Sequence, residues 1–179
     1  MPRRTKPRTP RVFRLLKRLR FVSMLNAMES PSSQPTLIGE TKSGLAEMTA
    51  LIVDDEAHIR EYLRLVLKTL GLTTVWEAGN GEEGFKLYQE HRPSVVLLDV
   101  NMPIMSGDEL MQQFAVAYPD AVVIAVTSQN EHEMVKRFIK LGATGYLLKH
   151  LPKDQIIRRL AEVLGRIAEA DEEPEAAVG

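Results

Sequence analysis

Short apolar segments alternate with amphipathic segments between residues 49 and 170, and this alternation constrains the fold more than any other feature of the sequence. Three of the apolar segments are continuous runs: TALIV (49–53), VVLLD (95–99) and AVVIAVT (121–127). Continuous apolar runs are typical of parallel strands that are buried on both faces of a sheet. A regular succession of strands and helices favours right-handed crossovers, which place helices on both faces. The sequence therefore predicts a doubly wound α/β domain.

Apolar periodicity and terminating residues set the limits of the predicted elements. We expect strands at residues 49–53, 73–78, 95–99, 121–127 and 144–149. We expect helices at residues 58–71, 81–92, 106–119, 132–142 and 153–170. These elements place the compact domain at residues 48–168. Residues 169–179 are acidic and contain a proline, and we expect them to form a disordered tail.

The N-terminal segment differs from the rest of the chain in charge. Residues 1–47 carry 10 Lys and Arg against 3 Asp and Glu, a net charge of +7, whereas the remaining residues carry 13 against 21, a net charge of −8. We expect residues 1–47 to be a disordered basic extension. The alternative is an arm that contacts an anionic membrane or nucleic acid. Basic residues interrupt its apolar stretch, which is not typical of a secretory signal.

Composition excludes several other classes of protein. No apolar run approaches the roughly 20 residues that a transmembrane helix needs. The chain has no cysteine, which excludes disulfides and thiolate metal sites and agrees with a cytoplasmic location. The glycines at 79, 81 and 84 do not follow the dinucleotide-binding fingerprint, and we expect no nucleotide cofactor.

Polar residues gather where the predicted strands end. Acidic residues 54–56 follow the first strand, and Asp99, Thr127 and Lys149 end the third, fourth and fifth. In a doubly wound sheet these carboxyl ends form one edge, where ligands bind. Two carboxylates about 4 Å apart repel by on the order of 4 kcal/mol at an effective dielectric of 20, so a cluster of them needs a cation. Oxygen ligands without His or Cys favour Mg²⁺ or Mn²⁺.

A site of this kind is suited to phosphoryl transfer. A divalent cation and an ammonium group can screen the charge on the equatorial oxygens of a phosphoryl group. A carboxylate beside them can act as the nucleophile and form an aspartyl phosphate.

Four motifs surround these positions: LIVDDE (51–56), VVLLDVNMPIMSG (95–107), AVTS (125–128) and GATGYLLK (142–149). In them the sequence resembles the receiver domain of bacterial two-component response regulators, the chemotaxis-type fold. The resemblance implies a flavodoxin-like sheet of five strands in the order 2-1-3-4-5. It also implies a stand-alone receiver that is not an enzyme beyond self-catalysed phosphoryl acceptance and autodephosphorylation. The implied partners are a histidine kinase or histidine phosphotransfer protein and a downstream target protein, and we expect no DNA-binding domain.

The resemblance further implies a role for each residue around the acceptor. Asp99 is similar to the phosphoacceptor. Asp55 is similar to the direct magnesium ligand, and Asp54 to a residue that acts mainly through water. The backbone carbonyl of Asn101 would complete the protein ligands of the metal.

Three further residues resemble the parts of a switch. Thr127 is similar to the hydroxyl that moves to bond the phosphoryl oxygen. Lys149 is similar to the cation that pairs first with Asp99 and then with the phosphoryl group. Tyr146 is similar to the aromatic residue that moves inward with the hydroxyl. The readout would be a surface of helix 132–142, strand 144–149 and helix 153–170, with candidate residues Lys136, Lys140, Tyr146 and Arg158.

The loop after Asp99 contains two residues with special backbone properties. Pro103 restricts φ in this loop. Gly107 permits either an unusual backbone angle or a close approach that other residues resist, and the sequence does not decide between them.

Two other functions use the same residues. A magnesium-dependent phosphohydrolase could pass through an aspartyl phosphate, but such enzymes usually carry an acid two residues after the nucleophile, where this chain has Asn101. A receiver-like scaffold that binds partners without phosphorylation is the other alternative. The sequence leaves homodimerisation open.

Overall fold

The computed structural model describes residues 45–128 and 132–172. A five-stranded parallel sheet in the order β2-β1-β3-β4-β5 forms its centre. The strands are β1 (Thr49–Val53), β2 (Thr74–Ala78), β3 (Val95–Asp99), β4 (Val123–Thr127) and β5 (Gly145–Leu148). The helices between and after them are α3 (Ala57–Thr69), α4 (Gly81–His91), α5 (Gly107–Ala117), α6 (His132–Lys140) and α7 (Lys153–Glu172). The predicted doubly wound, flavodoxin-like sheet and its strand order are confirmed.

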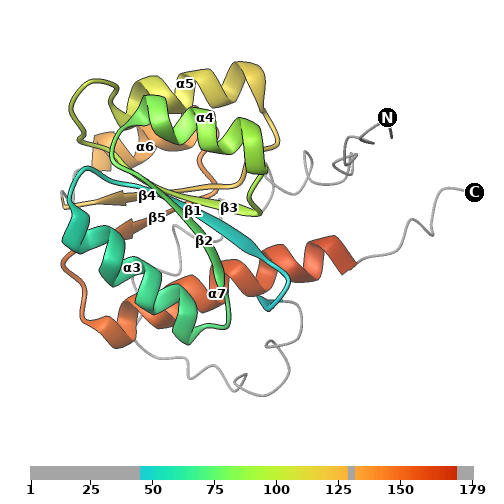
Figure 1. Cartoon of the computed structure of the whole chain (residues 1–179). Helices are drawn as coiled ribbons and strands as arrows, with labels where there is room; N and C mark the ends of the chain where they lie inside the picture. The colour runs from blue at the N-terminus through green and yellow to red at the C-terminus, as the bar shows by residue number, and fades with distance from the viewer. Residues whose placement is uncertain (1–44, 129–131, 173–179) are drawn as a thin grey trace, which may run out of the picture. The chain divides into compact units, whose positions relative to one another are not determined.

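Helices cover both faces of the sheet (Figure 1). Helices α3 and α7 lie on one face, and α4, α5 and α6 lie on the other. Every residue of β3, β4 and β5 is buried, as expected for strands covered on both sides. This double cover is the physical reason for continuous apolar runs in the sequence, because no side chain of a central strand faces water. It also leaves the carboxyl ends of the strands as the place where polar residues can gather.

Several predicted boundaries differ from those observed. Strand β4 begins at Val123 rather than residue 121, and helix α5 ends at Ala117, two residues before Pro119. Helix α7 continues to Glu172, two residues beyond the predicted helix end at 170, so residues 169–172 of the predicted acidic tail are helical. Ile167 is buried, so the packed face of α7 reaches the predicted domain end. Residues 173–179 lie outside the described residues.

The predicted basic extension falls almost entirely outside the described residues. Of residues 1–47, the structure describes 45–47, and Leu45 is buried together with Met48. The packed region therefore includes at least one residue that we placed in the extension. None of the helices in the described ranges has the length and apolar character required to cross a bilayer.

Candidate functional site

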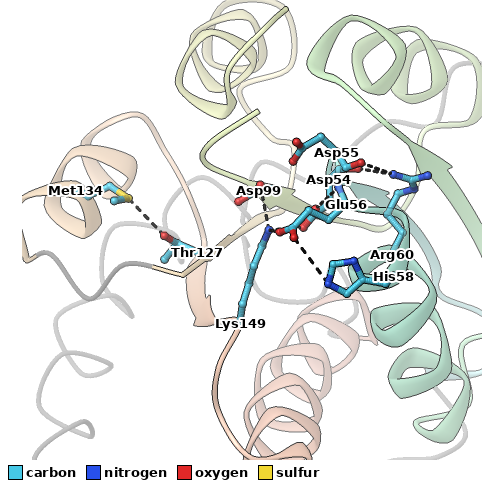
Figure 2. Close-up of polar contacts among 9 residues, drawn as sticks. All are labelled: Asp54, Asp55, Glu56, His58, Arg60, Asp99, Thr127, Met134 and Lys149. Carbon is cyan, nitrogen blue, oxygen red and sulfur yellow. Dashed lines mark hydrogen bonds and ion pairs between the residues drawn. The ribbon is translucent and has the colours of Figure 1, made fainter. Parts of the chain in front are cut away.

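Three aspartates from two strand ends meet at the carboxyl edge of the sheet (Figure 2). Asp54 and Asp55 directly follow β1, and Asp99 is the last residue of β3. One carboxylate oxygen from each lies within 4.8 Å of one from each of the other two. Asp54 and Asp99 are buried, whereas Asp55 is exposed. The strands β1 and β3 pair directly, which is why residues about 45 positions apart in the chain come together.

The ammonium group of Lys149 reaches this cluster from the end of β5. Its Nζ lies 2.8 Å from Oδ2 of Asp54, 3.0 Å from Oδ2 of Asp99 and 3.1 Å from Oε1 of Glu56. Burial by itself lowers the pKa of Lys149, but the hydrogen bonds and charges of Asp54 and Asp99 outweigh burial and raise the pKa. The lysine is therefore a protonated cation that three carboxylates share.

Asp99 shows that one lysine does not neutralise the cluster. Burial raises the pKa of Asp99, the hydrogen bond and charge of Lys149 lower it by less, and the charge of Asp54 raises it further. The net shift is upward. Lys149 therefore stays charged, and the surrounding carboxylates hold more negative charge than it balances.

Both carboxylate oxygens of Asp54 have partners. Its Oδ1 accepts a hydrogen bond from the backbone N–H of Glu56 at 2.9 Å. Its Oδ2 is buried and pairs with the Lys149 ammonium at 2.8 Å. Three carboxylates within 4.8 Å of one another, two of which share one ammonium group, fit a hard divalent cation.

The loop after Asp99 closes back onto the strand. The backbone N–H of Asn101 donates a hydrogen bond to the Asp99 carboxylate, and that of Gly107 donates one to Val100 O at 3.0 Å. A Cβ atom at Gly107 would lie 2.2 Å from the backbone oxygen of Asp99. Glycine is therefore required here by close approach and not by a positive φ. The role of the Asn101 carbonyl as a metal ligand stays a prediction.

One residue of this loop, Ile104, has a left-handed backbone conformation that we did not predict from the sequence. Ile104 has φ 72° and is exposed, and the N–H of Met105 donates to Pro103 O at 2.9 Å across it. This is the rare γ-turn with positive φ, which is strained for a β-branched residue. The strain lies five residues from Asp99.

The two predicted switch residues are both inside the protein. Thr127 is 1% exposed, and its hydroxyl donates to Sδ of Met134 on α6 at 3.6 Å (Figure 2). Tyr146 is 8% exposed and belongs to the hydrophobic core with Phe138. Our prediction that Tyr146 is part of the exposed readout surface was therefore wrong, because β5 is covered on both faces. The other three candidates on that surface are exposed: Lys136, Lys140 and Arg158.

Sequence reasoning missed three residues that contact the site. Glu56 was noted only as part of an acidic strand end, although it shares Lys149. Arg60 on α3 donates to the backbone oxygens of Asp54 and Asp55 at 2.7 and 3.2 Å. Met134 accepts the Thr127 hydroxyl. The spacing of Arg60 from the aspartates places it in the first turn of α3, but no pattern in the sequence distinguishes it from a surface arginine.

The fold and the residues at the carboxyl edge of its sheet define a class of protein. It is a doubly wound α/β domain in which aspartates and a lysine at the strand ends form a single acidic site. Residues 50–161 match the response regulator receiver domain family. The chain therefore belongs to this family, and it contains a receiver domain of a two-component system.

Relatives differ in how much of their length this chain matches. It is 36% identical to chemotaxis protein CheY of Listeria monocytogenes over 110 residues, which cover 62% of this chain and 92% of that protein. It is 35% identical to transcriptional regulatory protein YdfI of Bacillus subtilis over 119 residues, covering 65% of this chain and only 55% of YdfI. The similarity to YdfI thus leaves nearly half of that regulator unmatched.

A solved complex also has a similar fold. In the CheX–CheY–BeF₃–Mg²⁺ complex of Borrelia burgdorferi, the matching chain is 26% identical, with a TM-score of 0.62 over 65% of this chain and 89% of that chain. The family, the fold and the acidic cluster thus agree on a CheY-like receiver.

Proposed function

We propose that this protein accepts a phosphoryl group on Asp99, from a histidine kinase or a histidine phosphotransfer protein. The observation that carries the proposal is the 3.0 Å contact between the buried Asp99 carboxylate and the Lys149 ammonium, inside a cluster of three aspartates. A buried carboxylate whose pKa is raised gains from losing negative charge or from acquiring a cation. A metal ion at this place supplies that cation before the phosphoryl group arrives.

Asp99 is a better acceptor than its two neighbours. Asp54 is already held on Oδ1 by the Glu56 N–H. Asp55 is exposed, and Lys149 makes no contact with it within the described residues. Asp99 and Asp54 are both buried and both contact Lys149, which lies at the end of a different strand, and of the two Asp99 occupies the phosphoacceptor position of the receiver family. The Lys149 cation can screen the charge of an incoming phosphoryl group.

The carboxylates of Asp54, Asp55 and Asp99, with the backbone carbonyl of Asn101, would hold the metal ion. Mg²⁺ is the expected ion and Mn²⁺ the alternative, because all the donors are oxygen. When bound, the ion supplies charge neutralisation for the phosphoryl oxygens.

The side chains of the protein carry out the remaining steps. A carboxylate oxygen of Asp99 attacks the phosphorus atom, a P–O bond forms, and the bond from phosphorus to the donor's histidine nitrogen breaks. The electron pair of that bond leaves with the imidazole. Lys149 stays in contact with Asp99 throughout, and its positive charge offsets the negative charge of the incoming phosphoryl group. The chain accepts and later loses the group by itself, without turnover of a small substrate.

Phosphorylation would also change the switch residues. The aspartyl phosphate adds roughly −1.5 to −2 charge at one point. Thr127 would then exchange the weak acceptor Met134 for a phosphoryl oxygen, and α6 would shift with it. A target protein would recognise the altered surface of α6, β5 and α7. The Borrelia burgdorferi complex, whose title pairs CheY with CheX, supports a protein as the target of a similar chain.

The direct test uses acetyl phosphate as donor and mass spectrometry of the intact protein. In the presence of Mg²⁺ we expect an adduct of about 80 Da, the mass of one phosphoryl group, that disappears when EDTA removes the metal. Asp99→Asn should remove the adduct. Asp120→Asn, at the opposite end of the strands, is the matched control and should keep it. An adduct that survives Asp99→Asn would refute the assignment.

Two further assays separate the alternatives. Repeated hydrolysis of a small phosphate ester, faster than the decay of the adduct, would indicate a phosphohydrolase. Tight binding of a kinase without any adduct in Mg²⁺ would indicate a scaffold.

A further inference from the structure

The direction of the Asp55 carboxylate depends on its backbone. Asp54 is held by the Glu56 N–H and by Lys149, and Asp99 by Lys149 and the Asn101 N–H. Asp55 differs from both, because no hydrogen bond or ion pair to its carboxylate occurs among the described residues. Its oxygen nevertheless lies within 4.8 Å of the other two. Some other feature must therefore hold Asp55 toward the cluster.

Arg60 holds the backbone on both sides of Asp55. A single nitrogen, Nη1, donates to the carbonyl oxygen of Asp54 at 2.7 Å and to that of Asp55 at 3.2 Å (Figure 2). These two carbonyls belong to the two peptide planes that flank the Cα atom of Asp55. Because peptide units are planar, fixing both planes fixes the direction of the Cα–Cβ bond between them.

Arg60 is itself fixed by strand β2. Its Nε lies 3.4 Å from Oε2 of Glu77, and its side chain is only 19% exposed. Nε of Arg64 lies 3.2 Å from the other carboxylate oxygen of Glu77, Oε1. One carboxylate on the neighbouring strand thus holds two arginines of α3, of which only Arg60 reaches the aspartate loop.

We propose that Arg60 is a positioning residue that aims Asp55 at the divalent cation. The proposal rests on the metal site of the proposed function. Arg60 contacts neither the ion nor the phosphoryl group; it acts through the two carbonyl oxygens. Residues that orient metal ligands in this way change metal affinity about 10- to 100-fold when they are replaced.

Charge and positioning predict opposite results, which makes the proposal testable. Arg60 places a positive charge against the backbone of two of the aspartates, so its removal should strengthen the attraction for Mg²⁺ if charge alone matters. If Arg60 positions Asp55, its removal should weaken Mg²⁺ binding although the site becomes more negative. The sign of the change therefore decides between the two effects.

The experiment is calorimetric titration of the full chain with MgCl₂. For Arg60→Met, which keeps the length of the stem, we expect Kd to rise about tenfold. Arg60→Lys keeps the charge and a donor but loses the contact of Nε with Glu77, so its Kd should lie between the two. Arg64→Met is the matched control: it removes a charge from the same helix and the same Glu77, yet makes no contact with the aspartate carbonyls, and its Kd should not rise.

Thermal melting of each variant separates positioning from stability alone. A purely structural arginine would lower Tm and leave Kd for Mg²⁺ unchanged. If Arg60→Met does not melt cooperatively, Arg60→Lys and Glu77→Gln replace it, and both should raise Kd by less than tenfold. An unchanged or lower Kd in the folded Arg60 variants overturns the inference while leaving the metal site in place. Absence of Mg²⁺ binding by the unaltered protein overturns the proposed metal site itself.

Discussion

Replacement of Asp99 by asparagine should stabilise the protein when no metal is present. The substitution keeps the shape of the side chain and an oxygen that can accept from Lys149, and it removes one negative charge from the cluster. A change that abolishes the proposed function is thus expected to make the fold more stable. This follows from the charge balance at the carboxyl edge.

The magnitude can be worked from three contributions. The Lys149 ammonium, 3.0 Å away, attracts the Asp99 carboxylate by about 5.5 kcal/mol at an effective dielectric of 20. The Asp54 carboxylate, with an oxygen within 4.8 Å, repels it by about 3.5 kcal/mol on the same scale. Burial of an ion costs several kcal/mol more, which exceeds the difference between the two. The charged form of Asp99 is therefore unfavourable by on the order of 1 kcal/mol, in the same direction as its raised pKa.

The assay is thermal melting in EDTA and again in MgCl₂. In EDTA at neutral pH we expect Asp99→Asn to raise the free energy of unfolding by about 1 kcal/mol, which corresponds to about 4 °C in Tm for a domain of this size. In Mg²⁺ at ten times Kd, the unaltered protein gains about 1.4 kcal/mol from binding. The variant has lost a ligand and should gain less, so its advantage should shrink or reverse.

The pH dependence has a defined sign. A carboxyl group with a raised folded-state pKa binds its proton more tightly when folded, so stability falls as pH rises through that pKa. The difference between Asp99→Asn and the unaltered protein should therefore be absent in acid and appear as pH rises. Glu61→Gln, an exposed acid on α3, is the control and should change stability by less than about 0.5 kcal/mol. A variant that is less stable than the unaltered protein in EDTA would refute this charge balance.

Three further predictions concern neighbouring residues. Asp55→Asn should abolish the Mg²⁺-dependent rise in Tm while leaving the metal-free Tm nearly unchanged, because the side chain is exposed. Met134→Leu removes the acceptor of the Thr127 hydroxyl and should tighten binding of beryllofluoride about twofold, measured by ¹⁹F NMR, since a weak hydrogen bond of the resting state is lost. Gly107→Ala places a Cβ atom 2.2 Å from the Asp99 backbone oxygen and should cost about 3 kcal/mol in urea unfolding; a loss below about 1 kcal/mol would contradict the close approach.

The fold could be predicted because its determinants are local. The apolar runs VVLLD and AVVIAVT reveal buried parallel strands without knowledge of their partners. Acids and a lysine at successive strand ends must share one edge once the strands are parallel. The same logic brought Asp54, Asp55, Asp99 and Lys149 together correctly, and their proposed roles still await experiment.

Contacts across the sheet could not be predicted, because they depend on how side chains of distant segments pack. Lys149 and Glu56 are 93 residues apart, and nothing near either residue indicates that they meet. Tyr146 was expected partly at the surface, but it is buried in the core cluster that also contains Phe138 of α6. The direction of the Thr127 hydroxyl toward Met134 likewise depends on where α6 lies.

The sequence by itself thus determined the order of the elements and the chemistry gathered at their ends, since both follow from periodicity and from residue type. Only the tertiary structure decided why residue 107 must be glycine and which side chains hold the aspartates in place. The close approach of backbone atoms and the direction of a carboxylate depend on the exact separation of the packed segments. Such distances exist only after the helices have packed on the sheet.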